Sequence, residues 1–161
     1  MTDRTLTSAW TDTLRGRPEP GAVAERRRRT RARDIDAFTA ISGDRNPLHY
    51  DADLASASVF GRLIVQGGVT SGLLNALVAE DLPGPGTVFL AVEWSFVRAV
   101  GVGEMLTARA EVLSVRDDKP ICTLATTILN EAREPVLTGR ATTYTVPLRR
   151  TATQEGNFDD A

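Results

Sequence analysis

Two residues of one short segment could serve together as an acid and a base. His49 is the single histidine of the 161-residue chain, and Asp44 lies five positions before it. A carboxylate and an imidazole can exchange protons with a bound water at neutral pH when a turn brings them together. Each residue also has an ordinary interpretation, because a lone histidine is often only hydrogen-bonded and an aspartate after glycine can form an Asx turn. On these two residues alone the ordinary interpretation of the histidine is the more frequent one, and both interpretations stay open.

The loop between these two residues is predicted to be stiff. Pro47 cannot continue a helix and restrains Asn46 to an extended conformation, so both residues are expected to shape the loop. A helix is predicted before the loop, with Thr30 as its N-cap and Gly43 as its end, because apolar residues recur at three-residue spacing. These apolar residues are Ile35, Phe38 and Ile41.

A second predicted helix, over residues 68–80, has hardly any polar face and should be buried on most sides. Gly67 and Gly68 stand at its start, and the proline and glycine residues of 81–86 end it. The first N–H groups of a helix have no internal partner and carry the positive end of its dipole, so they can bind an oxygen that gains charge. Glycine at these two positions would let a substrate approach closely, or would only permit tight helix packing.

The rest of the chain has the pattern of strands. One strand is predicted at 22–30, a helical turn at 51–58, and four later strands joined by short turns typical of antiparallel neighbours. We therefore expect an α+β fold in which an antiparallel sheet wraps around a central buried helix. Residues 21–148 would form this domain, with a flexible N-terminal arm at 1–20 and a flexible C-terminal tail at 149–161, because both ends lack periodicity. The later strands are expected at 88–98, 105–115, 121–129 and 136–146.

Composition argues against several classes of protein. A formal net charge of −2 argues against a nucleic-acid-binding protein, which would carry a basic surplus. The single cysteine, Cys122, lies in an apolar segment and is expected in the core, which suits a reducing compartment. The sequence has no Cys/His cluster for a metal and no apolar run long enough to cross a membrane, so we expect a cytoplasmic protein without a metal site.

The segment around the acid/base pair resembles the hydratase-2 motif of the MaoC-like, R-specific enoyl-CoA hydratase and 3-hydroxyacyl dehydratase family. This resemblance implies a hot-dog fold over about residues 21–146. It also implies that Asp44 and His49 hold and activate a water molecule, and that the amide of Gly67 binds the thioester oxygen. The matching residues are Phe38, Ile41, Ser42, Gly43, Asp44, Asn46, Pro47, Leu48, His49 and Ala55.

Two positions depart from the family pattern where the substrate pocket is expected. Many members have a histidine directly before the glycine that binds the thioester oxygen, whereas this chain has Gln66. Eight positions after that glycine a small residue or serine often occurs, whereas this chain has Asn75. We therefore count Gln66, Gly68 and Asn75, together with Gly67, as candidate oxyanion or substrate-binding residues.

The resemblance implies a lyase that reversibly hydrates trans-2-enoyl thioesters to R-3-hydroxyacyl thioesters, as fatty acid or polyketide metabolism requires. The acyl group would be carried on coenzyme A or on the phosphopantetheine of an acyl carrier protein, without a metal or redox cofactor. The family also implies a homodimer or a higher homo-oligomer. Two alternatives stay open: a hot-dog acyl thioesterase, and a non-catalytic partner subunit that binds acyl thioesters.

Several other residues have both a functional and an ordinary interpretation. The arginines of 26–29, with Arg31 and Arg33, could contact the phosphates of coenzyme A or an acidic carrier protein. We favour a solvated strand and helix start, because alternate residues of a strand face opposite sides. Trp94 and Phe96 alternate with polar residues, and they are expected in the core or in an interface.

Overall fold

The computed structural model describes residues 8–148 and contains the helices and strands that the sequence predicts. The predicted tail at 149–161 and the first seven residues of the predicted arm lie outside the described residues. Within the described range, no helix has both the length and the apolar composition that crossing a bilayer requires. In chain order the elements are β1 (Val23–Arg29), α1 (Ala32–Ser42), α2 (Pro47–Tyr50), α3 (Ala52–Ala57), α4 (Gly67–Glu80), β2 (Thr87–Phe96), β3 (Met105–Val115), β4 (Ile121–Leu129) and β5 (Pro135–Thr145).

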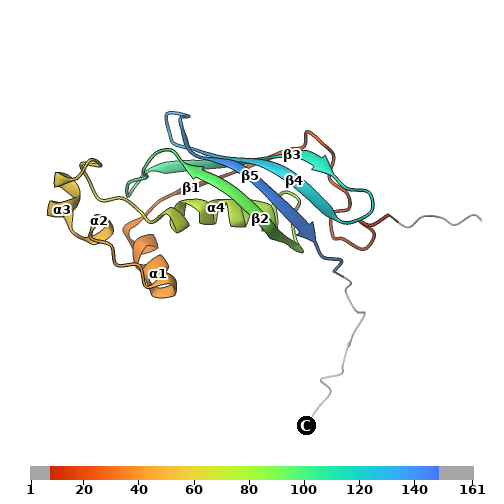
Figure 1. Ribbon diagram of the computed structural model, residues 1–161, viewed down its shortest axis with the longest axis horizontal. Coiled ribbons are helices and arrows are strands. Elements are labelled where there is room, and N and C mark those ends of the chain that lie inside the picture. The colour runs from red at the N-terminus through yellow and green to blue at the C-terminus, as the bar shows by residue number, and fades with distance from the viewer. Residues whose placement is uncertain (1–7, 149–161) are drawn as a thin grey trace, which may run out of the picture.

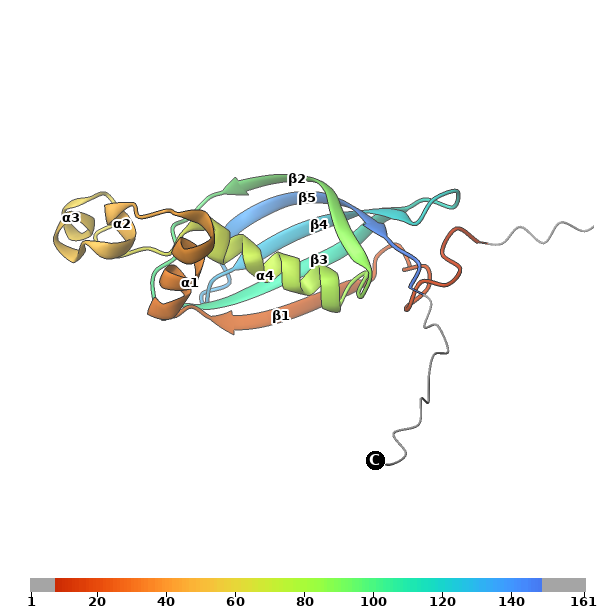
Figure 2. The same ribbon diagram turned by 90° about the horizontal axis from the view of Figure 1, so that it is seen from below.

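The five strands form one antiparallel sheet that wraps around α4. Their order across the sheet is β1-β3-β4-β5-β2, so β1 and β2 are the edge strands. Strands β3, β4 and β5 pair with their neighbours in the chain, whereas β2 joins the sheet beside β5. Figures 1 and 2 show α4 lying along the concave face of this sheet. The predicted α+β arrangement, a sheet around a central helix, is confirmed.

Burial of α4 against the sheet forms the main core. Leu74 and Leu77 have no exposed surface, and Leu73 keeps only 5% of its own. Each fully buried leucine contributes roughly 1.5–3 kcal/mol through the apolar area that it removes from water. The sheet residues of the same cluster come from β3, β4 and β5, and they are Leu106, Ala108, Ala110, Ile128, Val136 and Leu137.

The N-terminal segment belongs to the domain, which corrects the expectation of a separate arm for residues 8–20. Trp10 is only 3% exposed and belongs to a buried cluster with Val78, Val112 and Leu124. Its indole N–H donates to the carbonyl of Arg116 at 2.9 Å, so the ring is anchored as well as buried. Hydrophobic periodicity does not detect this segment, because the single side chain of Trp10 attaches it to the domain and the sequence around it has no repeating apolar pattern.

Helix α1 begins and ends through specific contacts. The Asp34 carboxylate accepts a hydrogen bond from the amide of Arg31 at 2.8 Å, and Arg31 is the N-cap residue. The predicted cap, Thr30, is therefore wrong: its buried hydroxyl donates to the carbonyl of Gly101 instead. Gly43 ends the helix in the left-handed conformation, at φ 77°, which glycine adopts without strain.

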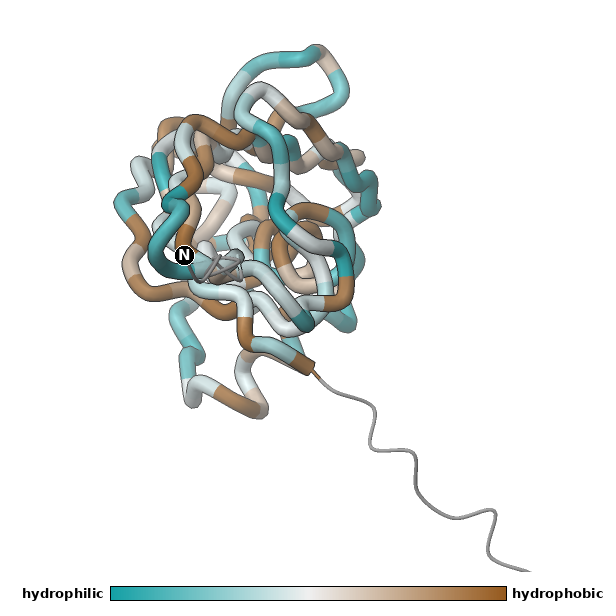
Figure 3. Tube along the Cα trace, turned by 90° about the vertical axis from the view of Figure 1, so that its right-hand side faces the viewer, coloured by the Kyte–Doolittle hydropathy of each residue, from teal (hydrophilic) through white to brown (hydrophobic). Residues whose placement is uncertain are grey.

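The two ends of α4 have different surroundings. Helices α1, α2 and α3 gather beyond its N-terminal end, and the segment before β1 lies at the opposite end (Figures 1 and 2). The loop between α1 and α2 therefore lies at the same end of the molecule as the first residues of α4. Figure 3, viewed along the long axis, shows hydrophobic stretches of chain both around the middle of the body and on its outer side.

Candidate active site

The loop that carries the acid/base pair is shaped by its own hydrogen bonds. The Oδ1 atom of Asp44 accepts from the amide of Asn46 at 3.0 Å, which is an Asx turn. The side chain of Asn46 in turn accepts from the amide of Leu48 at 3.1 Å and caps α2. Pro47 is the first residue of that short helix, where its missing N–H leaves no bond unmade. Asn46 and Pro47 thus act on the shape of the loop.

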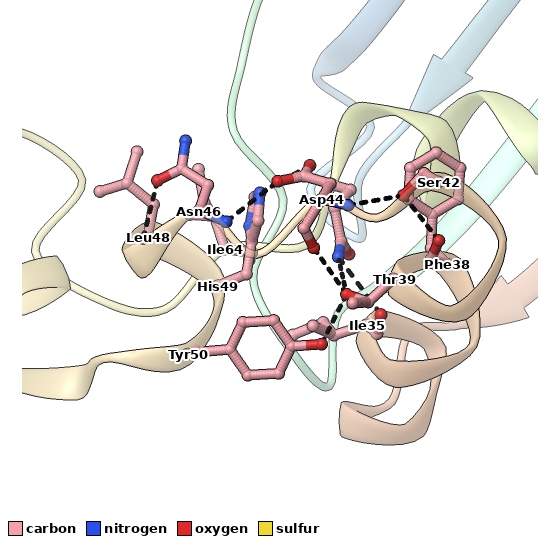
Figure 4. A network of polar contacts seen from close by, with 11 residues as sticks. Ile35, Phe38, Thr39, Ser42, Asp44, Asn46, Leu48, His49, Tyr50 and Ile64 are labelled. Carbon is pink, nitrogen blue, oxygen red and sulfur yellow. Dashed lines mark hydrogen bonds and ion pairs between the residues drawn. The ribbon is translucent and has the colours of Figure 1, made fainter.

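The imidazole of His49 is held between the main chain and Asp44, as Figure 4 shows. Its Nδ1 atom lies 2.7 Å from the carbonyl oxygen of Ile64. A carbonyl can only accept, so Nδ1 carries the proton in the neutral ring and Nε2 has a free lone pair. Nε2 faces Oδ2 of Asp44 at 3.5 Å. The side chain of His49 is 8% exposed and that of Asp44 is 38% exposed, so solvent reaches the pair from the side of the carboxylate.

This geometry suits a water molecule between the two side chains. An unprotonated ring nitrogen and a carboxylate oxygen are both acceptors, and 3.5 Å is longer than an ordinary hydrogen bond. A water can donate one hydrogen to each of them while its own oxygen stays free to react. The arrangement can therefore take a proton from a water and return one.

The two glycines at the start of α4 have different neighbours. Gly67 is exposed, and the atoms nearest to a Cβ atom there would belong to the ring of Phe96, at 3.2 Å. At Gly68 a Cβ atom would lie 2.0 Å from the ring of Phe38 in α1, so this glycine is needed for the contact between α1 and α4. The packing interpretation therefore applies to Gly68. Gly67 leaves its amide, the first of the helix, open to a ligand.

A cavity of about 320 Å³ opens beside Gly67. Its wall includes Ile64, whose carbonyl holds His49, although neither Asp44 nor His49 lines the cavity directly. Phe96 is 55% exposed and lines the cavity, so it is not a core residue, whereas Trp94 packs against the core. Much of the remaining wall is apolar and comes from Phe60, Val65, Val97 and Val100.

The two residues that depart from the family pattern lie away from this cavity. Gln66 is 1% exposed, and its side-chain amide donates to the carbonyl of Ile35 and to the hydroxyl of Thr39, both in α1. Asn75 is exposed on α4 and is not among the cavity residues. Their predicted contact with substrate has no support in this geometry and stays a prediction.

The arginines of β1 mostly have partners within the protein. Arg26 forms an ion pair with Asp81 at 2.7 Å, and its hydrogen bond holds the pKa of that carboxyl below its usual value. Arg28 pairs with Asp34 at 2.5 Å. These contacts favour the interpretation as a solvated strand over a phosphate-binding surface. The expected burial of Cys122 is confirmed, and burial raises the pKa of its thiol.

Sequence reasoning missed two residues that contact the loop. Thr39 in α1 is 6% exposed, and its hydroxyl donates to the carbonyl of Asp44 at 2.7 Å. The phenol of Tyr50 lies 2.5 Å from the same hydroxyl. A signal was present, because Thr39 stands four positions after the apolar Ile35 and thus on the buried face of the helix. A polar residue at such a position must find a buried partner.

Comparison with known proteins gives consistent matches to one family. The family model described as "MaoC like domain" matches residues 15–132. An (R)-specific enoyl-CoA hydratase of Aeromonas caviae is 40% identical over 123 residues, which cover 76% of this chain and 92% of that protein. A 3-hydroxybutyryl-CoA dehydratase of Methylorubrum extorquens is 34% identical over 108 residues, which cover 67% of this chain and 68% of that protein.

The fold agrees with solved structures of similar proteins. An (R)-hydratase from A. caviae involved in PHA biosynthesis superposes with a TM-score of 0.77 at 38% identity, covering 80% of this chain and 98% of that one. An R-hydratase from Pseudomonas aeruginosa, in its unliganded form, gives a TM-score of 0.74 at 34% identity, covering 87% and 94%. These neighbours confirm the predicted hot-dog fold.

Proposed function

The chain belongs to the MaoC-like family, and we propose that it reversibly hydrates trans-2-enoyl thioesters to R-3-hydroxyacyl thioesters. One observation carries the assignment of the site. Asp44 and His49 each commit one side-chain atom to a main-chain partner, which leaves Oδ2 and Nε2 facing each other across 3.5 Å. Two acceptors held at this separation suit the binding and activation of one water.

In the hydration direction, the water donates its hydrogens to Oδ2 of Asp44 and Nε2 of His49. Its oxygen bonds to the β-carbon of the enoyl group while Nε2 takes one proton, and the electron pair of the double bond moves toward the thioester oxygen. The amide of Gly67, at the positive end of α4, stabilises the charge on that oxygen. The proton held by the pair is then delivered to the α-carbon on the same face. Dehydration is the reverse sequence.

The proposed chemistry uses only side chains and amides of this chain, without a resident metal or redox cofactor. Coenzyme A is the acyl carrier that the relatives at 40% and 34% identity favour, because both are named for coenzyme A substrates. The phosphopantetheine of an acyl carrier protein is the alternative carrier. The buried, unpaired Cys122 accords with the proposed cytoplasmic location.

We propose further that the protein is a homodimer that pairs along β2. The other edge strand, β1, carries four successive arginines, which protect an edge from pairing. Strand β2 instead exposes apolar side chains, with Val88, Leu90 and Val92 each about half exposed. Phe96 at the end of β2 also lines the cavity, so a second copy along this strand would extend the cavity wall. Light scattering after size exclusion should give twice the mass of one chain, and Leu90→Glu should lower it.

Purified protein with crotonyl-CoA tests the proposed function. Hydration removes the conjugated absorbance, and longer enoyl thioesters would define the preferred chain length. His49→Ala and Asp44→Asn should each lower kcat by about 10²–10⁴-fold, the usual contribution of general acid–base catalysis. Asp36→Asn, an exposed carboxylate of α1, is the matched control and should keep full activity. Unchanged turnover in His49→Ala would contradict the assigned roles, and release of free thiol would instead indicate a thioesterase.

A further inference from the structure

One hydroxyl of α1 contacts three parts of the candidate site at once. The Oγ1 atom of Thr39 lies 2.7 Å from the carbonyl oxygen of Asp44 and 2.5 Å from the phenol oxygen of Tyr50. It also lies 3.1 Å from Nε2 of Gln66. Figure 4 shows the contacts of Asp44 and Tyr50 with Thr39, below the acid/base pair. We call these three side chains, Thr39, Tyr50 and Gln66, the hydroxyl hub.

Proton counting allows a single arrangement of the hub. A threonine hydroxyl has one hydrogen to donate and two lone pairs that accept. The carbonyl of Asp44 can only accept, so Thr39 donates its hydrogen there. The amide nitrogen of Gln66 can only donate, and its orientation is fixed because it also donates to the carbonyl of Ile35 at 3.2 Å. Tyr50 must therefore donate the third bond. The hydroxyl of Thr39 is saturated and cannot rotate freely.

The three residues that bond to the Thr39 hydroxyl each are, or directly adjoin, a residue that the proposed chemistry needs. Asp44 is itself the carboxylate, and Tyr50 follows His49 directly in the chain. Gln66 precedes Gly67 and is the N-cap residue of α4. The Thr39 hydroxyl thus joins the first residue of the loop, the residue after His49 and the start of α4, whose first residue, Gly67, lines the cavity. Each joined atom lies on, or one residue away from, a proposed catalytic group.

Two of the three hub residues, Thr39 and Gln66, are buried, and this burial has a cost in hydrogen bonding. Thr39 is 6% exposed and Gln66 is 1% exposed. The Oε1 atom of Gln66 is buried and has no hydrogen-bond partner among the described residues. An unpaired buried polar atom is unfavourable, and an apolar side chain at position 66 would avoid it. A glutamine at this position is nevertheless favourable, because its Nε2 atom donates two hydrogen bonds that link the start of α4 to α1.

We propose that Thr39 is a positioning residue, which sets the Asp44 and His49 pair relative to the Gly67 amide through Tyr50 and Gln66. This inference rests on the proposed function and deepens it, because it explains how a loop and a separate helix are kept in register. In a site of this kind, a displacement of about 1 Å can lower the rate about 100-fold. None of the three hub residues lines the apolar cavity, so we expect loss of the hub to lower kcat more than it raises KM.

Thr39→Val tests the proposal, because valine keeps the shape of threonine and removes the hydroxyl. We expect kcat for hydration of crotonyl-CoA to fall about 100-fold, with KM within about threefold of the parent value. Thr39→Ser keeps the hydroxyl and should restore kcat. Thr143→Val is the matched control: it removes an equally buried hydroxyl from β5, where the partner is Cys122, and it should leave kcat unchanged.

A second readout does not require turnover. The chain has one histidine, so a single imidazole Hε1 resonance reports on His49 alone. This resonance should shift or broaden in Thr39→Val and keep its position in Thr39→Ser and Thr143→Val. If the parent protein hydrates no thioester, the proposed function fails, while the resonance still tests the positioning role.

The outcomes are decisive in both directions. A parent-like kcat together with an unmoved His49 resonance in Thr39→Val would overturn the proposal, as would a failure of Thr39→Ser to restore either signal. If Thr39→Val does not fold, Tyr50→Phe carries the test, because Tyr50 is 42% exposed and loses only one of the three bonds. That variant should show a smaller loss of kcat with the same pattern of KM and resonance.

Discussion

The two ends of α4 are held by different kinds of interaction. At the N-terminal end, besides the packing of Phe38 against Gly68, single polar contacts attach the helix and the loop: the hydroxyl of Thr39, the amide of Gln66 and the imidazole of His49. At the C-terminal end, a buried cluster that includes Trp10 packs against the helix, and an ion pair between Arg26 and Asp81 joins the helix end to β1.

This difference separates orientation from stability along one helix. A hydrogen bond fixes direction and proton position but adds little net free energy of folding, about 0.5–1.5 kcal/mol. Burial of apolar side chains contributes more to the free energy of folding, but it does not fix the position of any proton. We therefore expect catalysis to depend mainly on the N-terminal end of α4 and the free energy of unfolding mainly on the rest of the helix. Substitutions at the two ends should change different quantities.

The largest expected effect on stability comes from the end remote from the site. Trp10→Ala should lower the free energy of unfolding by about 3–5 kcal/mol, because it removes a buried aromatic side chain. Below its melting temperature the variant should keep the parent kcat for crotonyl-CoA. Urea denaturation and the absorbance assay measure the two quantities. Leu14→Ala, in the same segment but half exposed, is the control. A folded Trp10→Ala protein without activity would show that the two ends are coupled.

Substitution of the two glycines at the N-terminal end of α4 should have an intermediate effect on stability, and the two variants should differ from each other. Gly68→Ala places a methyl group against the ring of Phe38, and overpacking of this kind costs about 1–3 kcal/mol of stability. In Gly67→Ala the nearest neighbour is the exposed ring of Phe96, so its stability should stay near that of the parent while kcat/KM falls. Thermal melts and substrate titration of both variants separate these results. Equal melting temperatures would contradict the assignment of packing to Gly68 alone.

The smallest expected effect concerns the ion pair at the C-terminal end. Asp81→Asn should lower the free energy of unfolding by less than about 1 kcal/mol at pH 7, as for other partly exposed pairs. Because Arg26 lowers the pKa of Asp81, this contribution is present above the ordinary value of 3.8 and is lost as the pH falls through the lower folded value. Urea titrations of parent and variant should therefore converge in acid. A difference that persists there would point to packing as its cause.

Much of the fold was predictable because its patterns are local. Segments rich in β-branched and aromatic residues, separated by turn-like segments, indicated the later strands, and the nearly unbroken apolar composition of 68–80 indicated the buried helix. The motif from Phe38 to Ala55 predicted the family and the hydro-lyase class, which the comparisons confirm. Its spacing also predicted that Asp44 and His49 meet, and they do so within 3.5 Å.

The remainder depends on contacts between distant parts of the chain. Trp10 reaches its partner Arg116 across 106 positions, and Gln66 reaches Thr39 across 27. No periodic pattern encodes such single contacts. The different roles of Gly67 and Gly68 depend on where the ring of Phe38 lies after α1 has docked. The sequence therefore identified both glycines as candidates but could not show that Gly68 packs against Phe38 while Gly67 lines the cavity.

The hydrogen bond from His49 to the carbonyl of Ile64 has a consequence for how the enzyme can diversify. Every amino acid at position 64 supplies the same main-chain oxygen, so the tautomer of the imidazole survives any exchange of that side chain. Ile64 also lines the cavity in which we propose that the acyl group binds. Evolution or an engineer can thus reshape the preference for acyl groups at this residue and leave the proton-transfer apparatus intact.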